Sequence, residues 1–315
     1  MQKTINLISF LFLFLFAAAV SADDPIKHKM LLLDESRKQI VYVDQYEPAN
    51  NWISLSADGA LWDAQLIGDH KILVAVTDKG GYREYNIGDL KKAPAERKPV
   101  REVTAAKYKS TQSAIRFPDG RTVIAVNAGK NSIFYVFNKN GEEINAIKHS
   151  GIQGVRLVRR SPHDTLLVGD RTGRAWEIDL DGKEIRCVDV PGSHRKYIYQ
   201  VKELPNGHWL AATGYDCRIL EIDKENKTVR TLGGNPAPEG LTYIFFSKFQ
   251  VLPNGHIVVA TWTGHGAEDS RKGQQLVQFD KEGKVVWQWH DPALAGSLNG
   301  VIILDDLDTA KWNEE

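Results

Sequence analysis

A turn motif recurs along the chain and limits it to a repetitive β architecture. Residues 204–208 and 252–256 both read Leu-Pro-Asn-Gly-His, and a weaker copy, Phe-Pro-Asp-Gly, stands at 117–120. Each copy is followed directly by a short apolar segment. A proline followed by Asn-Gly or Asp-Gly supplies the dihedral angles that a tight turn between antiparallel strands needs. The motif therefore predicts β-hairpins at regular spacing.

A second set of turns follows the first set. Strand-like segments such as 133–137 precede these turns, and segments such as 284–289 follow them. The repeating unit is thus four antiparallel strands. One such unit cannot cover its own apolar faces, whereas units packed around an axis can, which is the β-propeller arrangement. The four turns lie at 138–141, 179–182, 223–226 and 280–283.

Counting the first strand of each unit predicts a six-bladed, all-β propeller. The sixth unit has only its first strand at the C-terminal end of the chain. The N-terminal segments 30–33, 39–43 and about 51–55 supply the other three strands of that unit. Both ends of the chain therefore close the last blade, which removes the open sheet edges. We expect one domain over 23–315, with the charged segment 91–101 as a loop. The first strands are expected to begin near Asp63, Ser113, Gln153, Gln200, Lys248 and Asn299.

The first 22 residues have the pattern of a cleaved signal peptide. Lys3 precedes an apolar run over about 5–20, and Val20-Ser21-Ala22 places small residues before the expected cleavage point. The alternative is an N-terminal anchor, although the run is short for a span of about 20 residues. We expect a secreted or periplasmic protein with no membrane attachment after cleavage.

The charge balance bears on possible partners. The chain has 40 basic and 40 acidic side chains, so its formal net charge is zero. Without a basic surplus, the usual electrostatic basis for binding nucleic acid is missing. We therefore expect no nucleic-acid partner.

The turn motif at 252–256, together with the segment 279–287, resembles secreted bacterial propellers of the PQQ-like and arylsulfotransferase-like groups. The resemblance implies the fold and export, but not the chemistry, because turn residues carry it. Quinone-dependent dehydrogenases of this kind usually have eight blades, a calcium site and often a disulfide between adjacent cysteines. Here six blades are predicted, and Cys187 and Cys217 lie thirty positions apart. Arylsulfotransferases use a histidine near the axis as the sulfate acceptor. No motif in this sequence assigns that role to a particular histidine. No cofactor and no metal is predicted.

Propeller topology predicts where a ligand would bind. The loops that enter the first strands and the loops between second and third strands share one face. The six aligned polar residues, Asp63 to Asn299, should form a ring at the channel mouth. Either this ring only hydrates the channel, or it binds a polar ligand with Asp63 and Lys248 supplying charge. Whether Cys187 and Cys217 form a disulfide is left open.

The loops on that face combine aromatic and charged side chains, as a carbohydrate or an anionic aromatic ligand would require. Glycines on both sides of His265 expose its imidazole, so His265 and His149 are the candidate acid/base residues. The protein is expected to bind a small molecule or glycan, as a hydrolase, lyase or transferase or without catalysis. The alternative is a propeller that docks a protein partner. Beyond the ring, the ligand-binding candidates are Trp62, Arg83, Arg171, Tyr199, Tyr215, Trp262 and His265.

Overall fold

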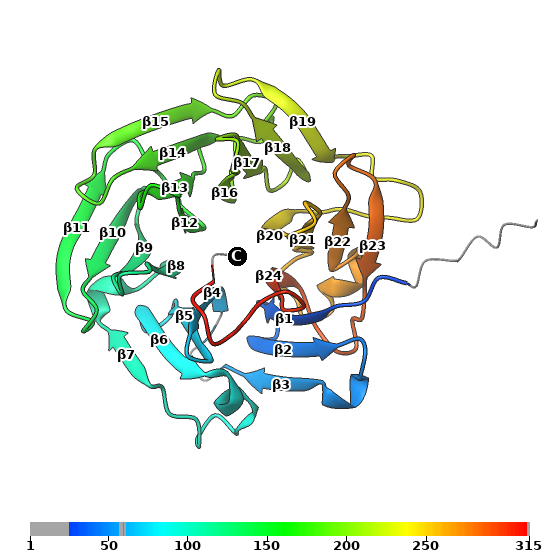
Figure 1. The fold of residues 1–315 in the computed structure, drawn as a ribbon, viewed down its shortest axis with the longest axis horizontal. Helices are drawn as coiled ribbons and strands as arrows, with labels where there is room; N and C mark the ends of the chain where they lie inside the picture. Colours follow the sequence, from blue (N-terminus) through cyan, green and yellow to red (C-terminus); the bar gives the residue numbers. More distant parts are fainter. Residues whose placement is uncertain (1–24, 57–58, 60, 314–315) are drawn as a thin grey trace, which may run out of the picture.

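The computed structural model describes residues 25–56, 59 and 61–313, and it shows six four-stranded antiparallel sheets arranged around one axis (Figure 1). The predicted six-bladed propeller is therefore confirmed. The predicted signal peptide, 1–22, lies outside the described residues. No helix in the described part of the chain combines the length and the apolar character that crossing a membrane requires.

The blades follow the chain in order. Blade 1 holds β4 (Leu61–Gly68), β5 (Lys71–Val76), β6 (Gly81–Asn86) and β7 (Arg101–Thr104). Blade 2 holds β8 (Thr111–Arg116), β9 (Thr122–Ala128), β10 (Asn131–Phe137) and β11 (Glu143–His149). Blade 3 holds β12 (Val158–Arg160), β13 (Leu166–Gly169), β14 (Arg174–Ile178) and β15 (Glu184–Asp189).

The remaining blades have the same plan. Blade 4 holds β16 (Gln200–Glu203), β17 (Trp209–Ala212), β18 (Arg218–Ile222) and β19 (Thr228–Gly233). Blade 5 holds β20 (Phe246–Val251), β21 (Ile257–Thr261), β22 (Leu276–Phe279) and β23 (Val285–Trp289). Blade 6 holds β24 (Leu298–Ile303), β1 (Lys29–Asp34), β2 (Gln39–Asp44) and β3 (Trp52–Leu55). Four short 3-10 helices lie in loops: η1 (Pro48–Asn50), η2 (Ile87–Lys91), η3 (Ala106–Tyr108) and η4 (Asp269–Lys272).

The two ends of the chain close the ring as predicted. The last strand, β24, pairs with β1, with Val301 opposite Leu32, and the sheet order is β24-β1-β2-β3. A further contact joins the ends, since Asp305 accepts a hydrogen bond from the backbone N–H of Lys29 at 2.8 Å. The charged segment 91–101 links β6 to β7, which agrees with its predicted place as a loop.

The turn between the first two strands explains one error in the predicted strands. In blades 2, 4 and 5 a glycine with positive φ occupies this turn: Gly120, Gly207 and Gly255. In blade 3 the same backbone bond, from Ser161 N–H to the Thr165 carbonyl, closes a turn in which Asp164 adopts φ 59°. Aspartate tolerates this region better than most residues. Because this turn lacks the glycine signal, the expected strand start near Gln153 is wrong.

Glutamine side chains bind each of three neighbouring pairs of blades together. Gln200 accepts a hydrogen bond from the backbone N–H of Phe249 at 2.9 Å and donates one to its carbonyl at 3.0 Å. Gln250 makes the same pair of bonds to Ile303, at 2.7 and 3.2 Å. Gln65 bonds in this way to Arg116. These bonds satisfy backbone groups on the innermost strands, which have no neighbouring strand on the channel side.

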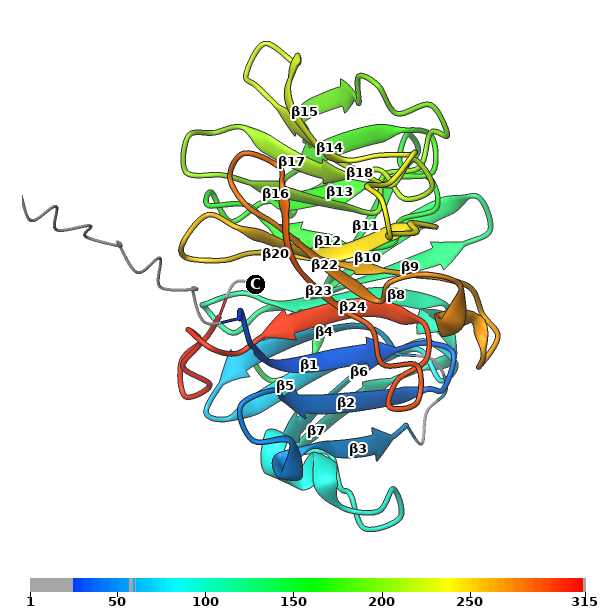
Figure 2. The same ribbon diagram turned by 90° about the vertical axis from the view of Figure 1, so that its right-hand side faces the viewer.

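The segment after β24 lies on the face opposite the entry loops. Figure 1 shows this segment, in red, passing beside β4, and in Figure 2 it lies beyond the end of β24. Trp312 donates from its indole N–H to the Arg116 carbonyl at 2.8 Å, and the Arg160 guanidinium lies 5.1 Å from its ring. These contacts hold the segment after β24 against blades 2 and 3 on that face.

Candidate functional site

A small hollow lies on the entry-loop face over the channel. Blades 1, 4, 5 and 6 contribute to it, together with the loop that enters β12. Loops entering first strands and loops between second and third strands both take part, which is the arrangement that propeller topology predicts. The lining residues are Trp62, Arg156, Tyr197, Tyr199, Tyr215, Phe245, Trp262, His265 and Asn299.

Aromatic side chains form most of the wall and hold one another in place. The Phe245 ring is at the centre, with its centroid 4.7 Å from that of Tyr215 and 5.4 Å from those of Tyr197 and Tyr199. The Trp262 ring centroid lies 5.7 Å from that of Phe245. All four contacts are edge-to-face, which is a favoured geometry for aromatic pairs. The hollow is therefore largely preformed.

Arg156 places a positive charge in this aromatic surrounding. Its guanidinium lies 4.7 Å from the Trp62 ring, and it donates to the Tyr197 hydroxyl at 2.5 Å and to the Gln112 side-chain oxygen at 2.6 Å. No carboxylate among the described residues forms an ion pair with it. A partly buried guanidinium normally has an anionic partner, because desolvating a charge is costly. Its Nη2 makes no hydrogen bond with the residues that the structure describes.

Three further polar groups in the hollow lack a partner. The Trp62 indole N–H, the Tyr199 hydroxyl and the Asn299 side-chain NH₂ are buried and make no hydrogen bond within the described part of the chain. Tyr199 and Asn299 are each only 2% exposed. Burial raises the pKa of Tyr199, so its hydroxyl stays protonated. All three groups can donate, and unsatisfied buried donors of this kind call for an accepting partner.

His265 and Glu35 form a pair at the rim of the hollow. Glu35 lies in the turn between β1 and β2, and its carboxylate accepts from His265 Nδ1 at 2.9 Å and from the Trp262 indole N–H at 3.1 Å. The Glu35 side chain is 10% exposed, whereas that of His265 is 70% exposed. The His265 ring also meets Trp262 edge-on at 4.8 Å. A buried carboxylate thus fixes an exposed imidazole and leaves its Nε2 available.

The predicted polar ring divides in the structure. Asn299 lines the hollow, whereas four other members form hydrogen bonds with other blades. Asp63 accepts two hydrogen bonds from Arg159, at 2.9 and 3.0 Å, and one from the Ser113 hydroxyl. Lys248 donates to the Ala64 carbonyl at 3.0 Å. With the Gln200 bonds already described, these groups are used in structural contacts rather than facing the hollow.

The sixth predicted ring member, Gln153, is not at an equivalent position. In each of blades 2 to 5, the residue whose N–H closes the first turn serves as the reference for the count. Four residues before it stand Ser113, Gln200 and Lys248 in blades 2, 4 and 5, but Leu157 in blade 3. Gln153 lies in the loop before β12, and its carbonyl accepts from the Arg171 N–H at 2.9 Å. An apolar residue therefore occupies the ring position in blade 3.

Of the other predicted candidates, Trp62, Tyr199, Tyr215, Trp262 and His265 line the hollow. Arg171 is at its edge, where its guanidinium lies 5.6 Å from the Tyr197 ring. Arg83 is elsewhere, in β6, and pairs with Glu102 at 2.6 Å. His149 ends β11 and borders a separate depression, with its ring 5.1 Å from that of Trp176.

Sequence reasoning missed Arg156, Phe245 and Glu35. The missing glycine in the blade 3 turn explains the first omission. With the correct alignment, Arg156 directly precedes the ring position, as Trp62, Gln112 and Tyr199 do in their blades. The aromatic and polar residues at this aligned position were the sequence feature from which Arg156 could have been predicted. Glu35 gave none, because it belongs to the N-terminal segment and reaches the site only through ring closure.

The structure offers little for a metal or a disulfide. Nowhere in the described ranges do three or more histidine, cysteine, aspartate or glutamate side chains gather as metal ligands would. The acids near His265 are engaged, since Glu268 pairs with Arg271 and Asp269 with Lys272, both at 2.7 Å. Cys187 and Cys217 are both free thiols.

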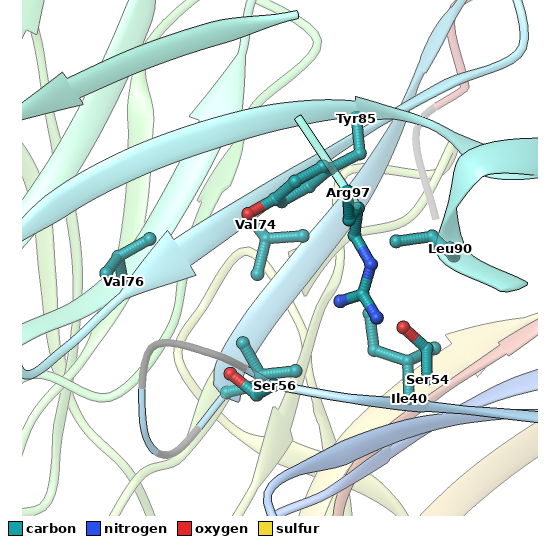
Figure 3. Close-up of a pocket in the computed structure, with 9 residues that line it drawn as sticks. Ile40, Ser54, Ser56, Val74, Val76, Tyr85, Leu90 and Arg97 are labelled. Carbon is teal, nitrogen blue, oxygen red and sulfur yellow. The ribbon is translucent and has the colours of Figure 1, made fainter. Parts of the chain in front are cut away.

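A second hollow lies between blades 6 and 1 and differs in character (Figure 3). Apolar side chains such as Ile40, Val74 and Leu90 line it, and Arg97 of the loop before β7 reaches across it. Arg97 donates to the backbone carbonyls of Leu55 and Lys92, at 3.0 and 3.1 Å. These bonds explain Arg97 as a group that ties its loop to blade 6.

Comparison with known proteins supports the fold alone. No protein-family model and no curated protein matches the sequence. A solved structure of a Bacteroides caccae protein of unknown function is similar, with a TM-score of 0.69 and 22% identity over 89% of this chain and all of that chain. A streptogramin B lyase structure matches with a TM-score of 0.59 and 10% sequence identity, over 87% of each chain. An inactive virginiamycin B lyase from Staphylococcus aureus, solved with quinupristin, matches with a TM-score of 0.57 and 8% sequence identity, over 86% of each chain. The chain is related in fold to bacterial propellers, and neither the PQQ-like nor the arylsulfotransferase-like resemblance gains support.

Proposed function

We propose that the protein binds a small ligand that carries a carboxylate on a ring, in the hollow over the channel. Arg156 carries this proposal, because it lines the hollow and no described carboxylate forms an ion pair with it. An anionic ligand would supply the missing partner and use the planar, forked geometry of arginine. The polar ring deeper in the channel is not needed for this role.

The walls of the hollow favour a flat ligand body. Trp62, Tyr197, Tyr215 and Trp262 offer faces and edges against which a sugar or an aromatic ring packs. The unpartnered donors on Trp62, Tyr199 and Asn299 suit ligand oxygens. Nine residues line this small hollow, so we expect it to hold a single ring rather than several. Uronic acids and aromatic carboxylates share this chemistry.

Calorimetric titration tests the proposal. We expect galacturonate or benzoate to bind, and the neutral counterparts galactose and benzyl alcohol to bind at least tenfold more weakly. Arg156→Gln should weaken binding about 10- to 100-fold, because a charge-assisted hydrogen bond contributes about 1.5–3 kcal/mol. The matched control is Arg121→Gln, which makes the same change in the β8–β9 turn on the opposite face.

The two probes distinguish the sources of the ligand. Galacturonate binding without benzoate binding indicates a uronic acid, and the reverse indicates an aromatic carboxylate. Equal binding of acids and neutral counterparts, or an Arg156→Gln protein that binds like the Arg121→Gln protein, would contradict the proposal.

We also propose that the protein is exported after cleavage behind Ala22. The sequence pattern of residues 1–22 supports this, and a ligand from outside the cell would then reach the site directly. Intact-mass measurement of the protein purified from its native cells should give a chain that begins at Asp23. A full-length chain recovered from the cytoplasm would contradict export.

The alternative of a protein-docking propeller finds no specific patch. Large exposed apolar side chains occur on the outermost strands of several blades, for example Ile53, Ile144, Ile185 and Val229. They are distributed around the rim rather than gathered on one face, as a docking surface would require.

A further inference from the structure

We infer that His265 removes the proton next to the carboxylate of the bound ligand, so that the site performs a β-elimination on a uronic-acid chain. This inference rests on the proposed function, because it needs the carboxylate to be held by Arg156. It goes further by naming a reaction and the residues that carry it.

The geometry of the His265–Glu35 pair is that of a base with an orienting carboxylate. Glu35 Oε1 accepts a hydrogen bond from His265 Nδ1 at 2.9 Å. A carboxylate can only accept, so Nδ1 carries the proton and Nε2 is left as the acceptor. Glu35 is itself fixed by its second bond, from the Trp262 indole N–H at 3.1 Å. A base held by a third group in this way is the arrangement that proton-transfer sites require.

The rest of the hollow provides what such a proton transfer needs. A hydrogen on the carbon next to a carboxylate is only weakly acidic. Removing this proton adds negative charge to a carboxylate that is already anionic. Arg156 supplies positive charge there, and the unpartnered NH₂ of Asn299 supplies a further donor. Donors aimed at developing charge are a major source of rate enhancement. Arg156, Asn299 and His265 all line the same hollow.

The chemical step balances without any added reagent. His265 Nε2 takes the proton from C5 of a uronate, and the C–H electron pair forms the C4–C5 double bond. The bond between C4 and its glycosidic oxygen breaks, and the electron pair leaves with that oxygen. The proton passes from the imidazolium to the departing oxygen through solvent. Nothing is oxidised or reduced, and the products are a shortened chain and an unsaturated uronate.

The experiment follows the ultraviolet absorbance of the unsaturated product. The full chain is incubated separately with oligogalacturonides and with oligoglucuronides, while calorimetry measures binding of the same sugars. We expect the absorbance to rise with at least one of them. His265→Ala should lower kcat at least 100-fold, within the range for removing a general base, while binding is kept. The control, His163→Ala, changes a histidine on the opposite face and should match the unmodified protein.

Glu35 is expected to act as a positioning residue. Glu35→Gln should lower kcat about tenfold with little change in KM, because the ligand contacts remain while the imidazole loses its orienting charge. Glu35→Asp should recover part of the loss, and the pH dependence of kcat should shift in Glu35→Gln. A residue that only held Trp262 in place would alter KM instead.

The possible outcomes separate the two proposals. Binding without an absorbance change, or equal rates for His265→Ala and His163→Ala, would overturn the elimination and leave the binding site standing. Absence of binding by both uronide series would overturn the elimination, and the benzoate titration then decides whether the binding site itself survives.

Discussion

At the scale of single residues, the molecule separates polar groups that hold the fold from polar groups that await a partner. Asp63 and Ser113 are fully hydrogen-bonded between blades. Tyr199 and Asn299 are as deeply buried, yet their donors have no partner among the described residues. An unsatisfied buried donor lowers the stability of the folded protein. The proposed carboxylate ligand would supply acceptors for the donors beside Arg156.

Tyr199→Phe tests this separation directly. The change removes a hydroxyl that makes no bond, so the free energy of unfolding should stay within about 0.5 kcal/mol or rise. The affinity for the carboxylate ligand should fall. Ser113→Ala removes a satisfied hydroxyl and should cost about 1–3 kcal/mol in urea unfolding. Equal destabilisation by the two variants would show that the Tyr199 hydroxyl has a structural partner.

The two thiols should be unreactive. Burial raises the pKa of Cys187 and of Cys217 to about 11. Because the thiolate is the reactive form, and a raised pKa keeps the thiol protonated, about one thiol in a thousand is ionised at pH 8. Alkylation of the native protein, followed by mass spectrometry, should be slow at pH 8 and fast after unfolding. Rapid labelling of the native protein would contradict this environment.

At the scale of elements, turn chemistry decided what the sequence could predict. The glycines of the turns at 120, 207 and 255 marked three hairpins correctly, because only a few residues adopt positive φ easily. Asp164 adopts the same conformation without that signal, so the predicted start of the blade 3 strand was displaced by four residues. The displacement put Gln153 in the ring and hid Arg156. A local signal thus located three of the hairpins, and its absence in blade 3 concealed Arg156, on which the proposed binding depends.

The glutamine contacts between blades should contribute measurably to stability. Gln250→Leu keeps the side-chain size but leaves the N–H and carbonyl of Ile303 without partners in the interior. We expect a loss of about 2–4 kcal/mol, since each unsatisfied buried group costs about 1–3 kcal/mol. Gln288→Leu on the exposed side of β23 is the matched control and should change stability by less than about 0.5 kcal/mol. Similar midpoints in urea would contradict the role of Gln250.

At the scale of the whole molecule, ring closure assembles the site. The hollow takes residues from position 62 to position 299, and Glu35 reaches His265 because β1 pairs with β24. The sequence predicted this closure from a count of strands, and five other candidates together with Asn299 line the hollow. It could not predict how deep each ring side chain lies. That depends on packing between blades, which no local pattern encodes.

Removing β24 should abolish the fold. A chain that ends at Ser297 leaves the inner edge of β1 unpaired and removes Val301 and Ile303 from the core they share with Met30 and Val258. We expect an insoluble or unfolded product. A chain that ends at Leu307 keeps β24, loses only the contacts of the last segment, and should give a native circular dichroism spectrum with a lower Tm. A folded, cooperative protein without β24 would contradict closure by both ends.

The most direct test of the binding site is a crystal structure of the protein with bound galacturonate or, if only the aromatic acid binds, with benzoate. The account predicts the ligand carboxylate within hydrogen-bond distance of the Arg156 guanidinium, with the ring against the aromatic walls formed by Trp62 and Tyr215. A ligand bound elsewhere on the propeller, or one whose carboxylate faces away from Arg156 into solvent, would contradict it.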